Sequence, residues 1–296
     1  MTVGATAVGG RPSGGGRRLS WAWLGALPFF GYVGLFLLLP TLVVVLGAFV
    51  DADGRPTTTN LSALTEDFVV TSFKNSIVLS AESALLGAAL GALVAYAIAT
   101  GKPDGALRRT FVAASGMLAQ SGGVTLAFGF IATIGGEGLL TILLRGADVD
   151  VSPTLLFGLG GLTIVYAYFQ IPLMVLVFLP ALDGIRPQWR EATETLGGSS
   201  WQYWRHVAVP ILTPPFLGAL LLLFANAFSA YATAAALISQ GSIIAPLQIR
   251  VALTSETLAG QENVGKAIAL GMIVVVGVVM ALYALVERRS AKWLRR

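Results

Sequence analysis

Residues 267–286, AIALGMIVVVGVVMALYALV, form a run of twenty positions without a charged side chain. A helix needs about 20 mostly apolar residues to cross the hydrocarbon core of a bilayer, so this run predicts a membrane-spanning helix. Its apolar residues are continuous and do not alternate with polar ones, which favours a helix over a strand of a membrane barrel. The stretch therefore indicates a helical membrane protein.

Five other runs of the chain are similar to this one in length and hydropathy. They cover approximately residues 23–50, 76–100, 110–134, 153–182 and 215–239. The composition agrees, because only 11% of the 296 residues are charged, whereas a soluble domain usually carries about 25%. A mean hydropathy of +0.78 points the same way. These values exclude a soluble globular enzyme, a disordered chain and a fibrous repeat. The sequence predicts an all-α polytopic membrane protein with six transmembrane helices.

The basic residues divide unequally between the two sides of the predicted membrane. With the N-terminus in the cytoplasm, 14 of the 19 Lys and Arg residues lie inside and five lie outside. The 15 acids show the reverse, with five inside, nine outside and Glu82 within a span. Because cytoplasmic loops of membrane proteins carry an excess of Lys and Arg, both termini are predicted to be cytoplasmic. The net charge of +4 is then a topology signal, and no nucleic-acid partner is expected.

The predicted spans divide the chain into three parts. Residues 1–20 are Gly-rich and basic, and we expect a disordered cytoplasmic tail there. Residues 21–290 form the six-helix transmembrane domain, with a polar cytoplasmic loop over residues 183–214, and residues 291–296 form a basic C-terminal tail. A cleaved signal peptide is the alternative for the N-terminus. The apolar run that follows is too long for it and lacks a clear small-residue cleavage site.

Few residues of the chain are suited to catalysis or metal binding. The sequence contains no Cys and a single His, His206, which excludes thiolate sites and a multi-His metal site within one chain. Residues 260–266, GQENVGK, have the spacing of a phosphate-binding loop. However, Ala267 stands where that loop needs a magnesium-binding hydroxyl group, and no predicted strand precedes it. We therefore expect no catalytic residue, no metal and no cofactor bound by this chain.

The loop over residues 183–214 predicts two short helices at the cytoplasmic surface. Pro187 suits the first position of a helix, and the glycine pair at 197–198 suits its end. Ser199 or Ser200 can cap a second helix that follows. Three Trp residues in the loop favour a position at the membrane interface. On these grounds alone, an amphipathic connector lying on the membrane stays open as an alternative.

The spacing within this loop resembles the conserved cytoplasmic loop of permease subunits in ATP-binding cassette (ABC) importers. That family's pattern is Glu-Ala-Ala, three residues, Gly, nine residues, Ile, one residue, and Leu-Pro. The matching residues are Glu191, Ala192, Thr193, Gly197, Val207, Val209 and Pro210. Thr193, Val207 and Val209 depart from the pattern, each to a small or aliphatic residue. The loop also precedes the penultimate span on the basic side, and the resemblance covers residues 28–286 approximately.

The resemblance implies the fold of a type I ABC importer permease and a coupling role for this loop. In the family the loop fits a cleft of a separate ATPase subunit. The residues expected to couple are Arg190, Glu191, Ala192, Thr193, Glu194, Gly197 and Pro210. The implied partners are a homologous second permease, an ATPase dimer that holds ATP and magnesium, an extracytoplasmic solute-binding protein and the lipid bilayer. The resemblance also implies the cytoplasmic membrane of a prokaryote and a chain that is not itself an enzyme.

Five polar residues within the predicted spans are candidates for a solute path. Glu82 is the single ionisable residue well inside a span, about two turns from the outer end of the second run, and an acid at such a position suggests a function. Asn226, Ser229 and Thr233 are spaced to share one face of the fifth span. Gln170 lies on the fourth span. Polar residues more often hold membrane helices together, and for these residues that alternative stays open.

The sequence leaves the transported solute open. Residues 228–234 and the pair Gly241-Ser242 are similar to ABC permeases for polyamines, phosphonate, thiamine and ferric ion. Sugar and glycerol-phosphate permeases are the alternative within the family. A stand-alone secondary transporter or channel is the alternative of another class. That class predicts several buried ionisable residues or inverted repeats, whereas this chain shows one acid within a span and no obvious repeat.

Overall fold

The computed structural model describes residues 22–51, 53–102, 104–147, 157–238, 244–254 and 262–293. Within these ranges the regular elements are helices, and one β-type pairing joins Val50 to Pro56. The described helical segments that are long and apolar enough to cross a membrane are Gly25–Gly47, Asp67–Ala99, Val124–Arg145, Leu159–Asp183, Ser200–Ser229 and Asn263–Arg288. The prediction of an all-α chain with six spans is confirmed. The predicted N-terminal tail, the Gly241-Ser242 pair, Gly260 and residues 294–296 lie outside the described residues.

The chain forms two compact units, of which the first ends at Val44. Its described elements are α1 (Ala22–Val33), a π-helical turn (Gly34–Leu38) and the first part of α2 (Leu39–Gly47). The π turn has a local cause, because Pro40 has no N–H group and its ring clashes with the carbonyl group four residues earlier. The helix widens there, and the Leu39 N–H donates to the Gly34 carbonyl. The span thus stays helical across Pro40.

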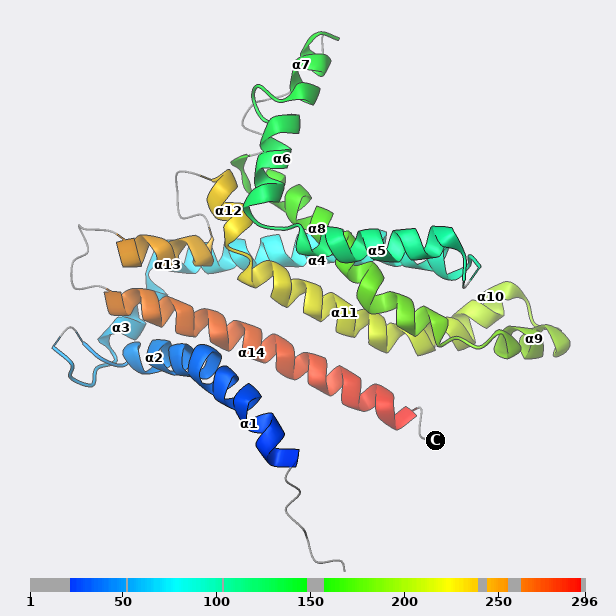
Figure 1. Cartoon of the computed structure of the whole chain (residues 1–296), viewed down its shortest axis with the longest axis horizontal. Coiled ribbons are helices and arrows are strands. Elements are labelled where there is room, and N and C mark those ends of the chain that lie inside the picture. Colours follow the sequence, from blue (N-terminus) through cyan, green and yellow to red (C-terminus); the bar gives the residue numbers. More distant parts are fainter. Residues whose placement is uncertain are drawn as a thin grey trace, which may run out of the picture. The chain divides into compact units, whose positions relative to one another are not determined.

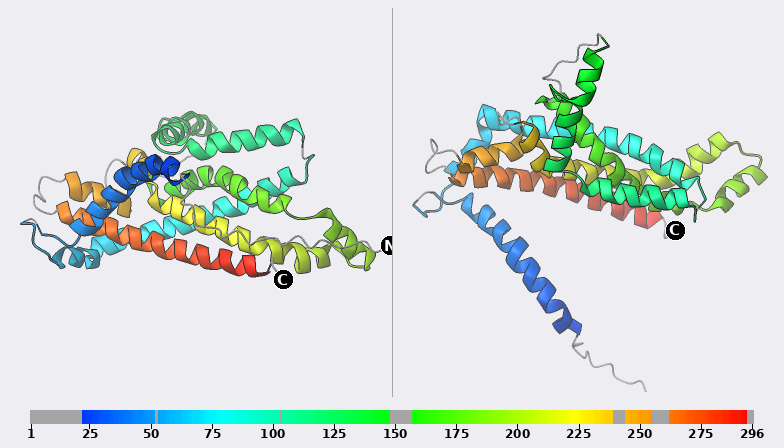
Figure 2. Two further views of the ribbon diagram at one scale, coloured as in Figure 1. Left: turned by 60° about the horizontal axis from the view of Figure 1, so that its bottom comes forward. Right: turned by 45° about the horizontal axis from the view of Figure 1, so that its top comes forward.

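The second unit is built around four long helices that pack side by side (Figures 1 and 2). They are α4 (Asp67–Ala99), α8 (Leu159–Asp183), α11 (Val209–Ser229) and α14 (Glu262–Trp293). Two glycines bring α4 and α8 close together. A Cβ atom on Gly87 would lie 2.4 Å from the Cβ of Gln170, and one on Gly91 would lie 2.5 Å from the Cβ of Met174. Small residues at such positions let membrane helices pack with their backbones in near contact.

Shorter helices pack on this bundle or, like α7 on α6, on one another. They are α3 (Thr59–Ser62), α5 (Ala106–Gln120), α6 (Val124–Ile134), α7 (Leu139–Arg145), α12 (Ala232–Leu237) and α13 (Ala245–Thr254). α5 packs on α8, α6 packs on α12, and α13 packs on both α4 and α14. A further pair, α9 (Pro187–Thr195) and α10 (Ser200–Tyr203), lies at one end of the bundle (Figure 1). We call this the α9 end.

The third predicted span, residues 110–134, is wrong as a single helix. α5 and α6 are separated by a break at residues 121–123. Gly123 has φ = +83°, a left-handed conformation that an α-helix does not contain. The apolar segment long enough to span begins at Val124 and continues through α7 to Arg145. Because Gly is frequent in intact membrane helices, the glycine pair in this run did not reveal the break.

The fifth predicted span, residues 215–239, is shifted in the structure. The helical segment of this region is Ser200–Ser229. α11 ends because Ala230 adopts an extended conformation, with φ = −73° and ψ = 109°, and α12 follows as a separate short helix. Thr233 therefore lies on α12, apart from the polar residues of α11. The predicted common helix face of Asn226, Ser229 and Thr233 is wrong.

Candidate functional site

A tight turn between α9 and α10 forms the tip of the loop at the α9 end. α9 begins at Pro187, as the sequence predicts. After its last turn, the Gly198 N–H donates to the Thr193 carbonyl at 2.8 Å and the Gly197 N–H donates to the Glu194 carbonyl at 3.0 Å. This pair of bonds is a Schellman motif, which needs one left-handed residue, and Gly197 supplies it with φ = +76°. The predicted helix end at the glycine pair is confirmed.

The second helix of the loop begins with a complete capping box. Ser199, one of the two predicted caps, accepts a hydrogen bond from the Gln202 N–H, and the Gln202 side chain accepts one from the Ser199 N–H at 2.7 Å. The helix then widens into a π-helical turn, Trp204–Ala208, shortly before Pro210. As at Pro40, a proline without an N–H group accounts for the wider turn. Pro210 thus shapes the entry from the loop into α11.

Thr193 and Gly198 fit each other across the tip. The Thr193 hydroxyl group donates to the Trp189 carbonyl at 2.9 Å. A Cβ atom on Gly198 would lie 2.7 Å from the Thr193 Cγ2 and 3.0 Å from its carbonyl oxygen. The loop therefore needs both of its glycines, one for its φ angle and the other for space. The sequence spacing did not distinguish these two requirements.

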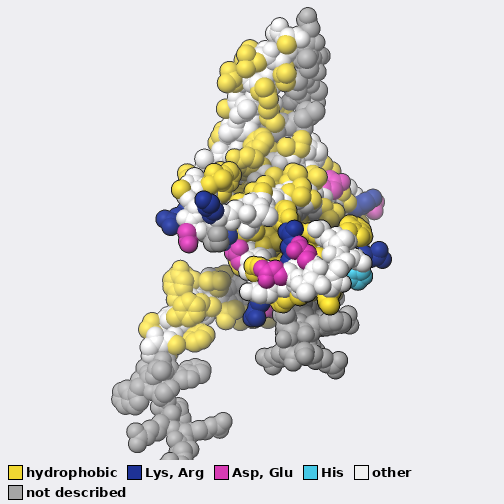
Figure 3. All heavy atoms as spheres, turned by 90° about the vertical axis from the view of Figure 1, so that its right-hand side faces the viewer, with side chains coloured by type: hydrophobic (Ala, Val, Ile, Leu, Met, Phe, Trp, Pro, Cys, Tyr) yellow, Lys and Arg dark blue, Asp and Glu magenta, His cyan; other side chains and the backbone are white. Residues whose placement is uncertain are grey.

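The tip exposes apolar and charged side chains together. Leu196 is 88% exposed and Trp201 is 71% exposed. Arg190 Nε lies 3.0 Å from Glu194 Oε1 on the surface of α9. The side chain of Glu191 is exposed, and the described part of the chain offers its carboxylate no ion-pair partner. Figure 3 looks onto this end of the molecule, where basic, acidic and His side chains gather. An apolar anchor surrounded by charges is typical of a protein-docking surface.

Two contacts join the base of this loop to the bundle. Arg108 of α5 forms a salt bridge with Asp183, the last residue of α8, and the Arg108 side chain is only 18% exposed. The Trp204 ring packs edge-on against Tyr96 of α4, with the ring centroids 5.5 Å apart. The loop is therefore tied to α4, α5 and α8. Sequence reasoning missed both contacts, because partners far apart in sequence leave no local pattern.

Hydrogen bonds between different elements involve four of the five path candidates, which are Gln170, Asn226, Thr233 and also Glu82. Gln170 is fully buried, donates to the Leu223 carbonyl at 2.8 Å and accepts a long hydrogen bond of 3.5 Å from Asn226. These bonds join α8 to α11. The buried Thr233 hydroxyl group accepts from the Gly123 N–H at 2.9 Å, which joins α12 to the break between α5 and α6. Gln170 and Thr233 thus hold helices together.

Two of the candidates, Glu82 and Ser229, are exposed at the surface of the chain. The Ser229 hydroxyl group donates to the Ala225 carbonyl of its own helix at 2.9 Å. Glu82 accepts a hydrogen bond of 3.2 Å from the Thr163 hydroxyl group. α4 begins at Asp67, nine residues before the predicted run, so Glu82 lies about four turns along the helix, although it is only about two turns inside the apolar run that begins at Ser76.

Curated proteins that are similar to the chain share one type of function. No protein-family profile matches the chain. The thiamine transport system permease protein of Escherichia coli is 30% identical over 108 residues, which are 36% of this chain and 20% of that protein. A sulfate transport system permease protein of Synechocystis is 27% identical over 165 residues, 52% of this chain and 58% of the relative. A putative ferric transport system permease protein of Haemophilus influenzae is 24% identical over 191 residues, 64% of this chain and 30% of the relative. The chain thus spans less than two thirds of the length of each relative.

The structural similarity extends over nearly the whole chain. A crystal structure of a bacterial ABC transporter involved in the import of the acidic polysaccharide alginate contains a chain that matches with a TM-score of 0.67 at 17% identity. The match covers 92% of this chain and 95% of the other. This chain has the fold of an ABC importer permease. Among the described residues, six helical segments are long and apolar enough to cross a membrane, as expected of a multi-pass membrane protein with this fold.

Proposed function

We propose that the chain is the transmembrane permease subunit of a type I ABC importer. It pairs with a homologous second permease, and the two enclose the solute path. An ATPase dimer docks on the α9 end, and an extracytoplasmic solute-binding protein delivers solute on the opposite side. Both chain termini lie in the cytoplasm, as the distribution of basic residues predicts. The observation that carries the proposal is the exposed α9 tip, with its Schellman turn at Gly197, on a permease fold.

The α9 tip suits mechanical coupling because it is rigid and projects from the bundle. Its helix is short, its turn is fixed by hydrogen bonds, and its base is tied to α5 and α8 by the Arg108–Asp183 pair. Leu196 is the apolar anchor that we expect to enter a cleft of the ATPase, since exposed apolar side chains at such positions contribute most to docking. The unpaired Glu191 is expected to meet a basic group of the ATPase. Movement of the ATPase is then transmitted to α8 and α11.

The solute path is proposed to include Gln170, Asn226, Ser229 and Thr233, with Glu82 at its border. Support differs among these residues. Asn226 and Ser229 are exposed polar residues close together on α11, which is what a path at a permease–permease interface requires. Gln170 and Thr233 are buried, and their hydrogen bonds hold in place the helices that border the proposed path. Ser229 is the last residue of α11, and discontinuous membrane helices commonly frame solute sites.

For the solute, we favour the group formed by polyamines, phosphonate, thiamine and ferric ion. The names of two relatives, a thiamine and a putative ferric transport permease, support this choice. A sugar or glycerol-phosphate importer is the second candidate, because a probable starch degradation products transport permease of Thermoanaerobacterium thermosulfurigenes is 24% identical over 137 residues. A stand-alone secondary transporter or channel is the alternative of another class. The chain itself hydrolyses no ATP in this proposal, since ATP and magnesium bind to the partner ATPase.

Charge reversal at Glu191 tests the coupling role. Glu191→Lys places a positive charge opposite the expected basic group of the ATPase, so we expect loss of ATPase co-purification and of ATP-driven transport. Glu191→Gln keeps the size of the side chain and is expected to give an intermediate effect. Glu137→Lys, an exposed acid in the turn between α6 and α7, is the matched control. Normal ATPase association and transport in the Glu191→Lys variant would contradict the proposed role.

A further inference from the structure

One face of α4 is apolar and exposed except for a single acid. Three of its apolar residues lie three or four positions from this acid and the fourth lies seven positions further along, so they share one side of the helix. The exposed apolar members include Val78, Leu85, Leu86 and Leu93, which are 42%, 57%, 46% and 65% exposed. Glu82 lies in the middle of this face and is itself exposed. We call these five residues the Glu82 face.

The position of Glu82 along the helix keeps it away from the membrane surface. The apolar run of α4 begins at Ser76, so Glu82 lies six residues inside it, which corresponds to about 9 Å of helix. A glutamate side chain is too short to reach back over that distance. Acids exposed to lipid at such depth are unfavourable and therefore rare, and they almost always face protein or a water-filled cavity.

The chain itself satisfies the Glu82 carboxylate poorly. Among the described residues, its one hydrogen-bond donor is the Thr163 hydroxyl group, which lies 3.2 Å from Glu82 Oε2 and 3.0 Å from the Leu159 carbonyl oxygen. Because a hydroxyl group has one hydrogen, these two acceptors share it. Among the described residues, no Lys, Arg or His lies within 4.0 Å of the carboxylate. A buried carboxylate in the assembled protein needs more donors than this.

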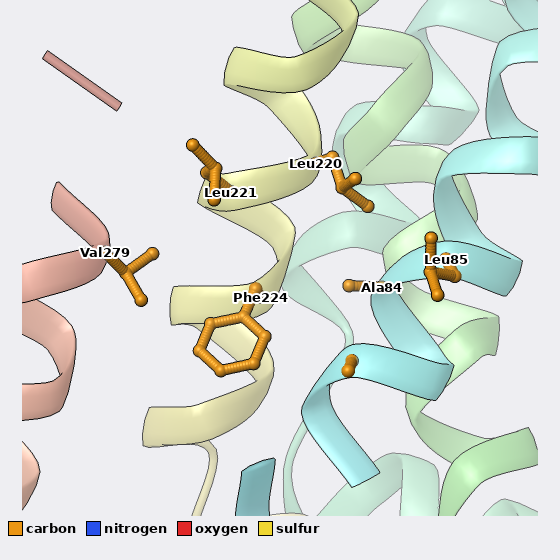
Figure 4. Close-up of a pocket in the computed structure, with 7 residues that line it drawn as sticks. Ala84, Leu85, Leu220, Leu221, Phe224 and Val279 are labelled. Carbon is orange, nitrogen blue, oxygen red and sulfur yellow. The ribbon is translucent and has the colours of Figure 1, made fainter. Parts of the chain in front are cut away.

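The neighbours of Glu82 fit a packed helix better than a wet path. The other residues of the Glu82 face are apolar, whereas a passage for a polar solute needs several polar groups. Ala81 and Ala89, beside this face, are small enough to let a second helix approach closely. Ala81 and Leu85 also border an apolar groove with Leu221 and Phe224 of α11 and Val279 of α14, shown in Figure 4. The apolar surface thus continues from α4 onto the neighbouring helices.

We infer that the Glu82 face is the surface on which α4 meets the second permease subunit, and that a hydrogen-bond donor or basic side chain of that subunit reaches the Glu82 carboxylate. The inference rests on the proposed function, because it needs a second permease. It assigns Glu82 to recognition of the partner subunit at the border of the path. One polar contact within an apolar helix interface fixes which subunit binds and in which register.

Substitutions at Glu82 separate a protein-facing from a lipid-facing position. The assembled importer, purified with its second permease and ATPase, is heated, and the midpoint at which the permeases dissociate is measured. Glu82→Gln keeps an acceptor, so a midpoint close to that of the wild type is expected. Glu82→Leu leaves the partner's donor unpaired, so a midpoint several degrees lower is expected. Because leucine suits lipid better than glutamate does, an unchanged or raised midpoint with Glu82→Leu would overturn the inference.

Cross-linking identifies what covers the face. The chain has no Cys, so Ala89→Cys introduces one reactive site, seven residues from Glu82 on the same side of α4. A benzophenone label there is expected to cross-link to the second permease, with a several-fold lower yield from Val278→Cys, an exposed apolar position on α14. Cross-links to lipid alone, to residues 25–44 of the same chain, or to labelled solute would each overturn the inference. A purified complex that lacks both the ATPase and a second permease would instead overturn the proposed function.

Discussion

Gly197 is the residue on which the shape of the α9 tip most depends. Its φ of +76° closes the turn, and no atom lies within 4 Å of the place where a Cβ would stand. A side chain at this position is therefore disfavoured by the left-handed backbone conformation and not by a steric clash. A side chain in place of Gly198 would instead clash with Thr193. Because the two requirements have different physical causes, they can be tested separately.

The first prediction concerns Gly197→Ala. A left-handed conformation costs a residue with a Cβ about 1–2 kcal/mol, so docking of the ATPase is expected to weaken about tenfold. The affinity of the purified permease for its ATPase measures this. Gly277→Ala on α14 is the control, because it adds the same methyl group into open space at a helical position. Equal affinities for the two variants would show that the turn does not shape the docking surface.

The second prediction concerns Tyr166, whose hydroxyl group donates to the Ala230 carbonyl at 2.6 Å. Tyr166 is fully buried, and Ala230 is the extended residue at which α11 ends. Tyr166→Phe leaves a carbonyl group unsatisfied at this break, which costs about 1–3 kcal/mol. We expect a lower thermal unfolding midpoint of the purified permease. Tyr168→Phe, on the exposed side of the same helix, keeps its ring contact with Phe130 and is expected to have no effect.

Two helix breaks meet in the structure, and their meeting is the main feature of this fold at the scale of its elements. The break between α5 and α6 lies against α12, where the Gly123 N–H donates to Thr233. The break between α11 and α12 is held by Tyr166 of α8. Each break exposes backbone polar groups that a membrane cannot hydrate, so each needs a side-chain partner from another element. The need for such partners explains why the hydroxyl groups of Thr233 and Tyr166 are buried beside these breaks.

The sequence predicts the helical runs well because their signal, continuous hydropathy, is local. It also predicts both ends of α9, since Pro187 and Gly197 act through their own backbones. The breaks at Gly123 and Ala230 were missed, because Gly is common in intact membrane helices and an alanine carries no break signal. The partners of Gln170 and Arg108 lie far along the chain, so only the folded structure brings them together.

The third prediction concerns the Arg108–Asp183 pair, which joins α5 to the end of α8 where the loop begins. A double-mutant cycle with Arg108→Ala and Asp183→Asn is expected to give a coupling of about 0.5–1 kcal/mol in stability, because the pair is only partly buried. Single charge reversals are expected to reduce transport per ATP hydrolysed, and the swap of the two charges to restore part of it. Arg109→Asp, an exposed neighbour, serves as the control. If the effects of the two substitutions on stability are additive, the Arg108–Asp183 pair does not stabilise the base of the loop.

At the scale of the whole molecule, the second unit combines an apolar helical bundle with a charged, projecting α9 end. The six spans carry few charges, and the α9 end displays a tip whose shape is fixed by glycines, caps and prolines (Figure 3). Such a division suits a subunit that receives mechanical work from a soluble partner and turns it into movement of helices. A secondary transporter, in contrast, needs ionisable residues inside its spans to couple ions to solute.

ATP-dependent uptake into proteoliposomes tests this account most directly. The chain is reconstituted with its second permease and ATPase, and a labelled solute selected by a binding screen on the partner binding protein is supplied outside with that protein. The account predicts uptake that requires ATP on the ATPase side, persists when ionophores abolish ion gradients, and falls at least about tenfold with Glu191→Lys, which corresponds to about 1.4 kcal/mol. Uptake driven by an ion gradient without ATP, unchanged by Glu191→Lys, would contradict it.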